Sequence, residues 1–362
     1  MKKILSLLLC LVLTCAVLVS CDDPQIGDGT KDYPQTVEKV ERLDLNMYII
    51  TGDSTTDNAV KTVKSNIANH TKTTYNTVLN IFYVSESAYE STVLSALAEG
   101  GKDAPHIILI NSENLVDTLM ADNKLADLTD YFLSSDFGML NTQITSSLIN
   151  ASKFDSKLYT VPNNRVVGEY TYLVIDKEIA RDTLKYTNRE LMSYTSLEDA
   201  AELIADISAL GKNPDDYVKV VSGSYGLRDE LAAVAVGEKI YENYVNVIAS
   251  PIVTRAEAFE SAFAIVNTEE KYNDRAMQMI YAINNDIELR NLLQYGFSGS
   301  NYITEKATGN IVLIKDGINN YEMDITYTGD VFKAYNCSEI SWTNVEKAYG
   351  LLQNKDSKAE AK

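Results

Sequence analysis

Residues 158–178, LYTVPNNRVVGEYTYLVIDKE, hold two short apolar runs separated by a polar break. Leu158 to Val161 favours a β-strand, and Pro162 ends a ladder of backbone hydrogen bonds because proline has no N–H to donate. Asn163 to Arg165 show no amphipathic period, and a second apolar run follows from Tyr170 to Ile175. The break suits either a crossover between two α/β domains or a loop within one sheet. This stretch alone leaves both interpretations open.

Alternating strand-like and helix-like segments precede this stretch. Apolar runs at 43–50, 78–84 and 106–110 predict strands, with helical periodicity between them. That order is typical of a parallel sheet with right-handed crossovers. Ligands of such sheets lie beyond the carboxyl ends of the strands, which here are residues 51–54 and 111–113.

The pattern restarts after residue 178, with a second polar break at 250–255. The further elements that the sequence predicts are a helix at 196–210, a strand at 218–221, helices that begin at Asn273 and Asp286, a β pair formed by 310–315 and 321–327, and a last helix at 341–352. A chain of 362 residues exceeds what one hydrophobic core usually serves, so two domains are expected.

The N-terminus has the features of a secretory signal. Lys2 and Lys3 precede an apolar run that ends in Leu18-Val-Ser-Cys21, and this run is too short to favour a membrane span. The last four residues resemble the lipobox of bacterial lipoproteins, in which Cys21 would carry the lipid. That resemblance implies a mature protein anchored outside the cytoplasmic membrane by its lipid.

Cysteine and charge counts narrow the choice further. Cys10 and Cys15 lie in the predicted signal and Cys21 is assigned to the lipid, so Cys337 is left without a disulfide partner. The net charge is −19, and removal of Lys2 and Lys3 leaves 30 basic against 51 acidic residues, or −21. Such a charge repels nucleic acid and anionic lipid, so neither is an expected partner.

The sequence gives no positive support for catalysis, a metal or a cofactor. Neither of the two histidines, His70 and His106, has a second metal-type ligand at a useful spacing. The segment at Gly101-Lys102 lacks the first glycine of a phosphate-binding loop, and residues 296–300 do not match a nucleophile elbow. Paired carboxylates for glycoside hydrolysis stay open, because 51 acidic residues offer too many pairs.

Four segments, in their order behind the lipobox, resemble the solute-binding lipoproteins of bacterial ABC importers, of the carbohydrate-type, maltose-binding-protein-like family. They are Ala104–Ile110, Leu125–Asp130, Leu158–Lys177 and Asn273–Gly296. The resemblance covers most of the mature chain. It implies an α/β, two-lobe periplasmic-binding-protein-like fold, in which each lobe is a mostly parallel sheet flanked by helices and hinge strands join the lobes.

The same resemblance implies a domain plan and a set of partners. Residues 22–41 would form a tether, 42–164 with 262–335 the first lobe, 165–261 the second lobe, and 355–362 a charged tail. The second lobe could also include residues 336–354, an assignment left open between the two lobes, and the hinges are assigned to 158–178 and about 250–262. We expect a monomer that captures a solute and delivers it to ABC importer permease subunits.

Candidate ligand contacts lie at the edges where the resemblance implies a cleft. Tyrosine combines an apolar face with a polar tip that suits a sugar, and the chain has 23 tyrosines but one tryptophan. The candidates are Asp53, Asn111, Asn163, Asn164, Arg165, Glu169, Tyr170, Tyr225, Arg228, Tyr295 and Trp342. Each also has a structural interpretation, such as a turn at Asn163 and Asn164 or an ion pair between Arg165 and Glu169.

An oligosaccharide is the expected ligand, and three alternatives stay open. The scarcity of tryptophan departs from the common sugar-binding pattern, and Arg165 with Arg228 could hold a carboxylate of a peptide or another anionic solute. A surface-anchored glycoside hydrolase and a lipoprotein that only contributes to envelope structure are the other two.

Overall fold

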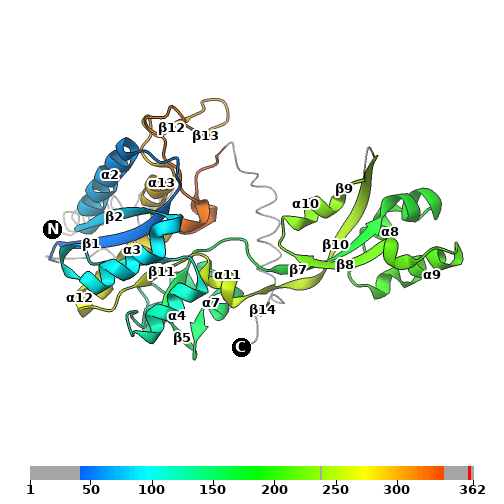
Figure 1. Cartoon of the computed structure of the whole chain (residues 1–362), viewed down its shortest axis with the longest axis horizontal. Coiled ribbons are helices and arrows are strands. Elements are labelled where there is room, and N and C mark those ends of the chain that lie inside the picture. Colours follow the sequence, from blue (N-terminus) through cyan, green and yellow to red (C-terminus); the bar gives the residue numbers. More distant parts are fainter. Residues whose placement is uncertain (1–40, 237–238, 338–357, 360–362) are drawn as a thin grey trace, which may run out of the picture. The chain divides into compact units, whose positions relative to one another are not determined.

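A computed structural model describes residues 41–236, 239–337 and 358–359. Figure 1 shows the whole chain. Several predicted features lie outside the described residues: the lipid-bearing Cys21, the tether up to residue 40, Trp342, the last helix and most of the charged tail.

The first sheet has five strands in the order β2-β1-β3-β11-β6. Its strands are β1 (Leu43–Thr51), β2 (Thr77–Ser85), β3 (Ile107–Ile110), β6 (Thr160–Pro162) and β11 (Ala262–Ile265). β1 pairs in parallel with β2 and β3, whereas β11 runs antiparallel to both β3 and β6. This sheet is mostly parallel, and the three predicted strands before residue 111 are confirmed.

Helices pack against this sheet because each carries an apolar stripe. The larger ones are α2 (Asp57–Tyr75), α3 (Glu86–Glu99), α4 (Glu113–Ala121), α12 (Glu270–Asn285) and α13 (Ile287–Tyr295). Val63 and Ile67 of α2 are fully buried, at the four-residue spacing of one helix face. Ser112 caps α4, and Asp286 caps α13 at the predicted start of that helix. The prediction that Asn273 begins α12 is wrong, because Glu269 occupies the N-cap.

Shorter elements complete this part of the chain. They are η1 (Gly101–Asp103), α5 (Thr129–Leu133), α6 (Met139–Gln143), α7 (Ser146–Ala151), β4 (Lys153–Phe154), β5 (Lys157–Leu158), α11 (Arg255–Phe259), β12 (Tyr302–Thr304), β13 (Ile311–Leu313), η5 (Ile325–Thr328) and η6 (Val331–Lys333). The predicted β pair is wrong. β13 pairs with β12, and residues 325–328 turn into a 3₁₀ helix that Asp324 caps through the Thr326 amide.

The second sheet has the order β14-β10-β7-β8, and β9 also pairs with β10. Its strands are β7 (Glu169–Asp176), β8 (Val218–Gly223), β9 (Ala233–Val236), β10 (Lys239–Val253) and β14 (Lys358–Ala359). β7 runs antiparallel to both β8 and β10. The sheet therefore differs from the mostly parallel one expected in each lobe, since apolar runs such as 170–175 do not reveal the direction of the neighbouring strand.

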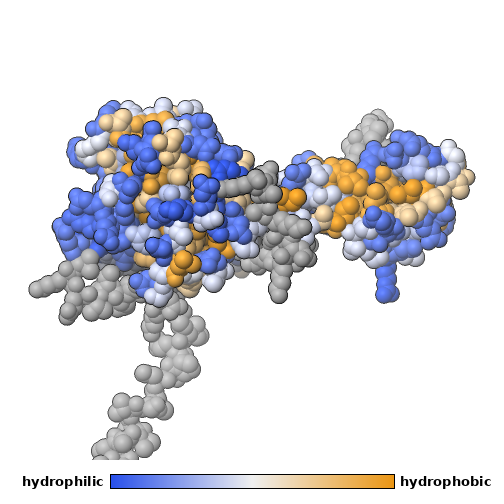
Figure 2. Space-filling model, turned by 90° about the horizontal axis from the view of Figure 1, so that it is seen from below, coloured by the Kyte–Doolittle hydropathy of each residue, from blue (hydrophilic) through white to orange (hydrophobic). Residues whose placement is uncertain are grey.

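Each face of the second sheet has its own apolar cluster. Leu173 and Ile175 pack on one face with Leu203 and Ile207 of α9, whereas the other face carries Tyr170, Tyr172 and Val174. Figure 2 shows apolar surface over the part of the chain that contains β7, β8 and β10, where Val220 and Ile252 are exposed. The helices here are η2 (Glu178–Thr183), α8 (Asn188–Leu191), η3 (Glu198–Ala200), α9 (Ala201–Ala209), η4 (Pro214–Asp216) and α10 (Leu227–Ala232).

The second polar break lies later in the chain than the sequence predicts. Ser250 and Pro251 belong to β10, and the pairing of this strand with β7 is irregular between Ala249 and Ile252. An irregularity of this kind accommodates proline, which cannot donate to the ladder. The chain leaves the strand at Thr254, the N-cap of α11.

Candidate functional site

A pocket of about 640 Å³ lies at the carboxyl ends of β1 and β2. Its walls come from the segment that follows β1, the start of α3 and the segment that leads into η5. The lining residues are Ile50, Thr51, Gly52, Asp53, Glu86, Ser87, Glu322, Met323, Asp324 and Tyr327. We call this the sheet-edge pocket. Its position is the one that parallel α/β sheets use for ligands, and it includes the predicted contact Asp53.

Carboxylates dominate the polar lining of the sheet-edge pocket. Asp53, Glu86, Glu322 and Asp324 all contribute, and among the residues that the structure describes no Lys, Arg or His lines the pocket. Ser54 donates to Glu322 Oε2 at 2.6 Å and thereby orients this side chain. An ionised carboxylate only accepts hydrogen bonds, so the pocket offers acceptors to a ligand rich in hydroxyl donors.

Glycine at position 52 allows the two walls to approach each other. The Gly52 amide donates to the Glu322 carbonyl at 2.9 Å, and a Cβ at this position would come within 2.6 Å of the Glu322 side chain. Any larger residue would displace Glu322 from the lining.

Tyr327 supplies the aromatic face of the pocket. Burial raises the pKa of its phenol to about 12, the negative charges of Glu86 and Asp324 act in the same direction, and the charge of Arg165 opposes them. The phenol therefore stays protonated at neutral pH. It offers one O–H donor beside a flat apolar ring, a combination that suits a polyol.

Buried polar side chains fix the backbone beside Tyr327. The Asn163 side-chain amide and the Ser261 hydroxyl both donate to the Thr326 carbonyl, at 2.9 and 2.6 Å. From α13, the fully buried Arg290 donates to the carbonyls of Ile325 and Asp330, at 3.2 and 3.0 Å. The pocket wall is therefore held by the ends of β6 and β11 and by a helix.

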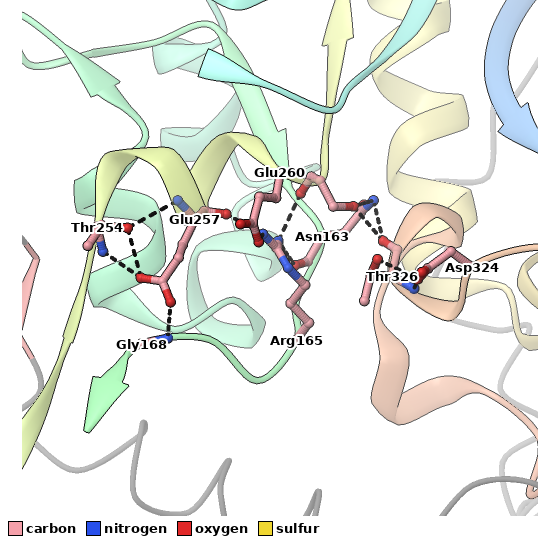
Figure 3. Close-up of polar contacts among 9 residues, drawn as sticks. Asn163, Arg165, Gly168, Thr254, Glu257, Glu260, Asp324 and Thr326 are labelled. Carbon is pink, nitrogen blue, oxygen red and sulfur yellow. Dashed lines mark hydrogen bonds and ion pairs between the residues drawn. The ribbon is translucent and has the colours of Figure 1, made fainter. Parts of the chain in front are cut away.

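Arg165 lies in a polar cluster where the chain leaves the first sheet and returns to it (Figure 3). Its guanidinium donates to the carbonyls of Asn163, Ser261 and Glu257, and Glu260 lies 4.0 Å away. Burial lowers the pKa of Arg165 to about 10, a value that keeps it charged at neutral pH. These contacts occupy the guanidinium with backbone oxygens, and Glu260 replaces Glu169 as its acidic neighbour.

Glu257 joins the two crossover segments. Its Oε2 accepts from the amide and the hydroxyl of Thr254, at 2.8 and 2.9 Å, and thus completes a capping box on α11. Its Oε1 accepts from the Gly168 amide at 2.8 Å, just before β7 begins. Figure 3 shows this one carboxylate between Thr254 and Gly168.

Three of the remaining predicted contacts are Asn111, Asn164 and Tyr295, and none of them is among the lining residues of the sheet-edge pocket. Asn111 follows β3 with its Oδ1 buried and without a hydrogen-bond partner among the described residues. Asn164 is buried and donates to Asp330, so both predicted asparagines of the crossover are packed inside the protein. Tyr295 ends α13, where it donates to the Tyr335 carbonyl and lines a neighbouring pocket of about 510 Å³.

The other candidates lie on the second sheet and its helix. Tyr170 is fully buried between Tyr172 and Tyr225, with ring centroids 6.3 and 5.4 Å apart. Both β7 tyrosines share a face because side chains two residues apart on a strand point the same way. Glu169 is exposed at the start of β7, and Arg228 is half-buried on α10. Neither they nor Tyr225 lines the sheet-edge pocket.

Sequence reasoning missed Glu86, Glu322, Asp324 and Tyr327. Glu86 directly follows β2, at the same sheet edge as Asp53, so the strand-end rule that selected Asp53 also applies to it. The other three lie in a segment that the sequence assigns to a strand, and their approach to Gly52 depends on contacts more than 260 residues apart.

Comparison with solved structures identifies this fold. An N-glycan transport solute binding protein from Streptococcus pneumoniae, in complex with Man1GlcNAc, is 14% identical, with a TM-score of 0.54 over 88% of this chain and 84% of that chain. A second structure of that protein gives 15% identity and a TM-score of 0.55 over 87% and 83%. This chain has the solute-binding-protein fold. The complex of the Streptococcus pneumoniae protein with Man5GlcNAc is 14% identical to this chain, with a TM-score of 0.54 over 87% of this chain and 83% of that chain.

The solute-binding-protein fold confirms the two-lobe α/β class that the sequence predicts. No protein-family model matches the chain, and no curated protein matches it. Among the described residues, no helix is long and apolar enough to cross a membrane, and no group of three or more His, Cys, Asp or Glu side chains could hold a metal ion.

Proposed function

We propose that the protein captures an oligosaccharide outside the cell membrane and delivers it to an ABC importer. The observation that carries this proposal is the sheet-edge pocket, in which acceptor carboxylates and the ring of Tyr327 line the same cavity. The fold supports it, since the similar solved structures include complexes of a transport protein with Man1GlcNAc and Man5GlcNAc. A sugar presents hydroxyl donors and an apolar ring face, and this pocket complements both.

The lining of the pocket favours a neutral sugar over an anionic solute. Four carboxylates, with no cation beside them in the described lining, would repel a carboxylate or phosphate. Arg165, a candidate from the sequence for binding an anion, donates its hydrogen bonds to backbone carbonyls instead. Both observations argue against the peptide or anionic-solute alternative.

The wider proposal concerns anchoring and motion. We place the first lobe around the first sheet and the second lobe around the second, with crossovers near Gly168 and Thr254 as hinges. Cys21 carries a lipid anchor, the protein acts as a monomer, and binding rather than catalysis is its role. The lipobox-like segment and the similarity to binding proteins support this description.

A ligand panel tests the proposal. The mature protein, with Cys21 replaced by Ser to avoid lipidation, is titrated by calorimetry with neutral mannose- and N-acetylglucosamine-containing oligosaccharides, oligogalacturonides and peptides. A neutral oligosaccharide at about 100 times its Kd should stabilise the fold by about 2.7 kcal/mol. Tyr327→Ala should raise the Kd by about ten-fold, because it removes both the ring face and the O–H donor.

The matched control is Tyr217→Ala, which removes a tyrosine that is not among the residues lining the pocket and should leave the Kd unchanged. Tighter binding of the oligogalacturonide would contradict the neutral-sugar assignment. Release of reducing ends during the titration would show a glycoside hydrolase. Absence of stabilisation by every solute would favour an envelope-structure role.

A further inference from the structure

The structure points to Glu257 as a positioning residue that sets ligand affinity through the crossover without touching the ligand. We infer that the bond from the Gly168 amide to its carboxylate holds one conformer of the hinge. The inference rests on the proposed function, because an affinity exists only if the protein binds a solute. The bond itself is measurable without any ligand.

The Glu257 side chain has two separate partners, one for each oxygen. Oε2 accepts hydrogen bonds from the amide and the hydroxyl of Thr254, which belong to the same helix cap. Oε1 accepts a hydrogen bond from the amide of Gly168, which lies 89 residues earlier in the chain. The cap needs only one oxygen, so the second oxygen is an addition that couples the segment before β7 to the segment after β10.

One partner in this bond is firmly fixed. Next to Thr254, Arg255 donates to Glu113 at 2.6 Å and to Asp117 at 3.0 Å, both on α4. Its guanidinium also lies over the ring of Phe154, 3.8 Å from the centroid. The Glu257 carbonyl accepts from the buried Arg165. Helix α11 is thereby bound to α4 and to the crossover that follows β6.

The other partner, Gly168, is a glycine whose backbone can change conformation. Gly168 has φ +107°, a region that residues with a side chain avoid. The Gly168 amide donates to the Glu257 carboxylate, and β7 begins at the next residue. A glycine between two packed elements, held by one side chain, can change its dihedral angles with little steric cost, as hinge residues do.

Loss of this bond should change the hinge equilibrium and, with it, the affinity. A ligand that binds one conformer has an apparent Kd that depends on the population of that conformer. A hydrogen bond to a charged group is worth enough to change such a population about ten-fold. Ligand contacts in the sheet-edge pocket would stay as they are, because Glu257 is not among its lining residues.

The experiment compares Glu257→Ala with Thr254→Ala. Both variants damage the α11 cap, but only Glu257→Ala removes the acceptor of the Gly168 amide. Amide exchange of Gly168, followed by NMR on the ligand-free protein, should accelerate about ten-fold or more in Glu257→Ala and less than about two-fold in Thr254→Ala. The Kd for the oligosaccharide found in the panel should change about ten-fold in Glu257→Ala alone.

The two readouts separate failure of the inference from failure of the proposed function. Equal exchange rates of Gly168 in the two variants would overturn the inference, whatever the protein binds. Accelerated exchange with an unchanged Kd would also overturn it, because the bond would then be local to the cap. If the native protein binds no solute in the panel, the proposed function fails while the exchange result still decides whether Glu257 holds the hinge. Glu257→Leu, which keeps much of the side-chain volume and has no oxygen to accept the Gly168 amide, replaces the alanine variant if that does not fold.

Discussion

His70 and Asp286 form the shortest histidine–carboxylate contact described in the chain. His70 Nε2 lies 2.6 Å from Asp286 Oδ2, which also accepts from the Tyr75 hydroxyl at 2.8 Å. Burial lowers the pKa of His70, but the hydrogen bond and charge of Asp286, with Glu288 nearby, outweigh it and raise the pKa. The pair joins α2 to the N-cap of α13, so its protonation state affects how these helices pack.

We predict that His70→Gln destabilises the fold most in weakly acidic solution. A raised folded-state pKa means that the charged pair contributes fully below about pH 6.5, the unfolded value, and is lost as the pH rises through the folded value. The pKa of Asp286 is lowered, since hydrogen bonds from His70 and Tyr75 outweigh burial, so its own contribution disappears only in strong acid. The cost should be about 1–2 kcal/mol at pH 5.5 and smaller at pH 8.5.

Urea unfolding at the two pH values measures this difference. Lys72→Gln is the control, because it removes a positive charge from the exposed side of the same helix and should cost the same at both pH values. A larger loss for His70→Gln at pH 8.5 than at pH 5.5 would contradict the assignment of the charged pair.

At the scale of elements, α13 acts as the support of the pocket wall. Arg290 reaches two carbonyls of the segment from Ile325 to Asp330, and burial lowers its pKa to about 10, which leaves it charged. Gln294, one turn later, donates to the Met323 carbonyl at 2.8 Å. A single helix face thus satisfies the backbone of a segment that has no strand partner of its own.

Arg290→Met should cost about 3 kcal/mol of folding free energy, because it removes two hydrogen bonds that a buried charged group donates to backbone carbonyls. It should also weaken ligand binding, since Tyr327 lies on the segment that these bonds hold. Chemical denaturation and calorimetry measure the two effects. Arg189→Met, at an exposed position of α8, should stay within about 0.5 kcal/mol. Unchanged binding in a folded Arg290→Met variant would show that the wall is held by other contacts.

Features that depend on neighbouring residues are predictable from the sequence, whereas features that depend on distant residues are not. Strands such as β1 and caps such as Asp286 are determined by neighbouring residues, and the sequence predicts them to within a residue or two. The strand directions around β7 and the approach of Glu322 to Gly52 depend on residues far apart in the chain, which local patterns do not encode. Asp53 is predicted because strand ends obey a general rule, whereas Tyr327 lies in the 3₁₀ helix η5, where the sequence predicts a strand.

At the scale of the whole molecule, the excess of negative charge lowers the stability of the compact folded state. The chain without its predicted signal carries 30 basic and 51 acidic residues, and the sheet-edge pocket concentrates four of the carboxylates. Such an excess destabilises a compact state through self-repulsion. The acidic surface thus favours solubility at some cost in stability.

We therefore expect the melting temperature of the ligand-free protein to rise with salt. An increase from about 0.01 M to about 1 M NaCl shortens the Debye length from about 30 Å to about 3 Å and screens the repulsion. Scanning calorimetry at pH 7.5 measures the change, and KCl at equal ionic strength should give the same rise. A melting temperature that falls over this range would show that attractive ion pairs outweigh the repulsion.

The position of β11 between β3 and β6 has a consequence for the order of folding. Ala262 is the register partner of both Ile110 and Pro162, so the edge of β3 has no neighbour until residues 262–265 have been synthesised. Closing the long loop between β6 and β11, residues 163–261, costs conformational entropy before any stabilising contact forms. Pairing of β11 is therefore slow. While the chain is being synthesised, the open edge of an apolar strand that is fully buried in the folded protein would be a template for aggregation, so completion of the first sheet depends on how quickly the whole of 163–261 emerges and collapses.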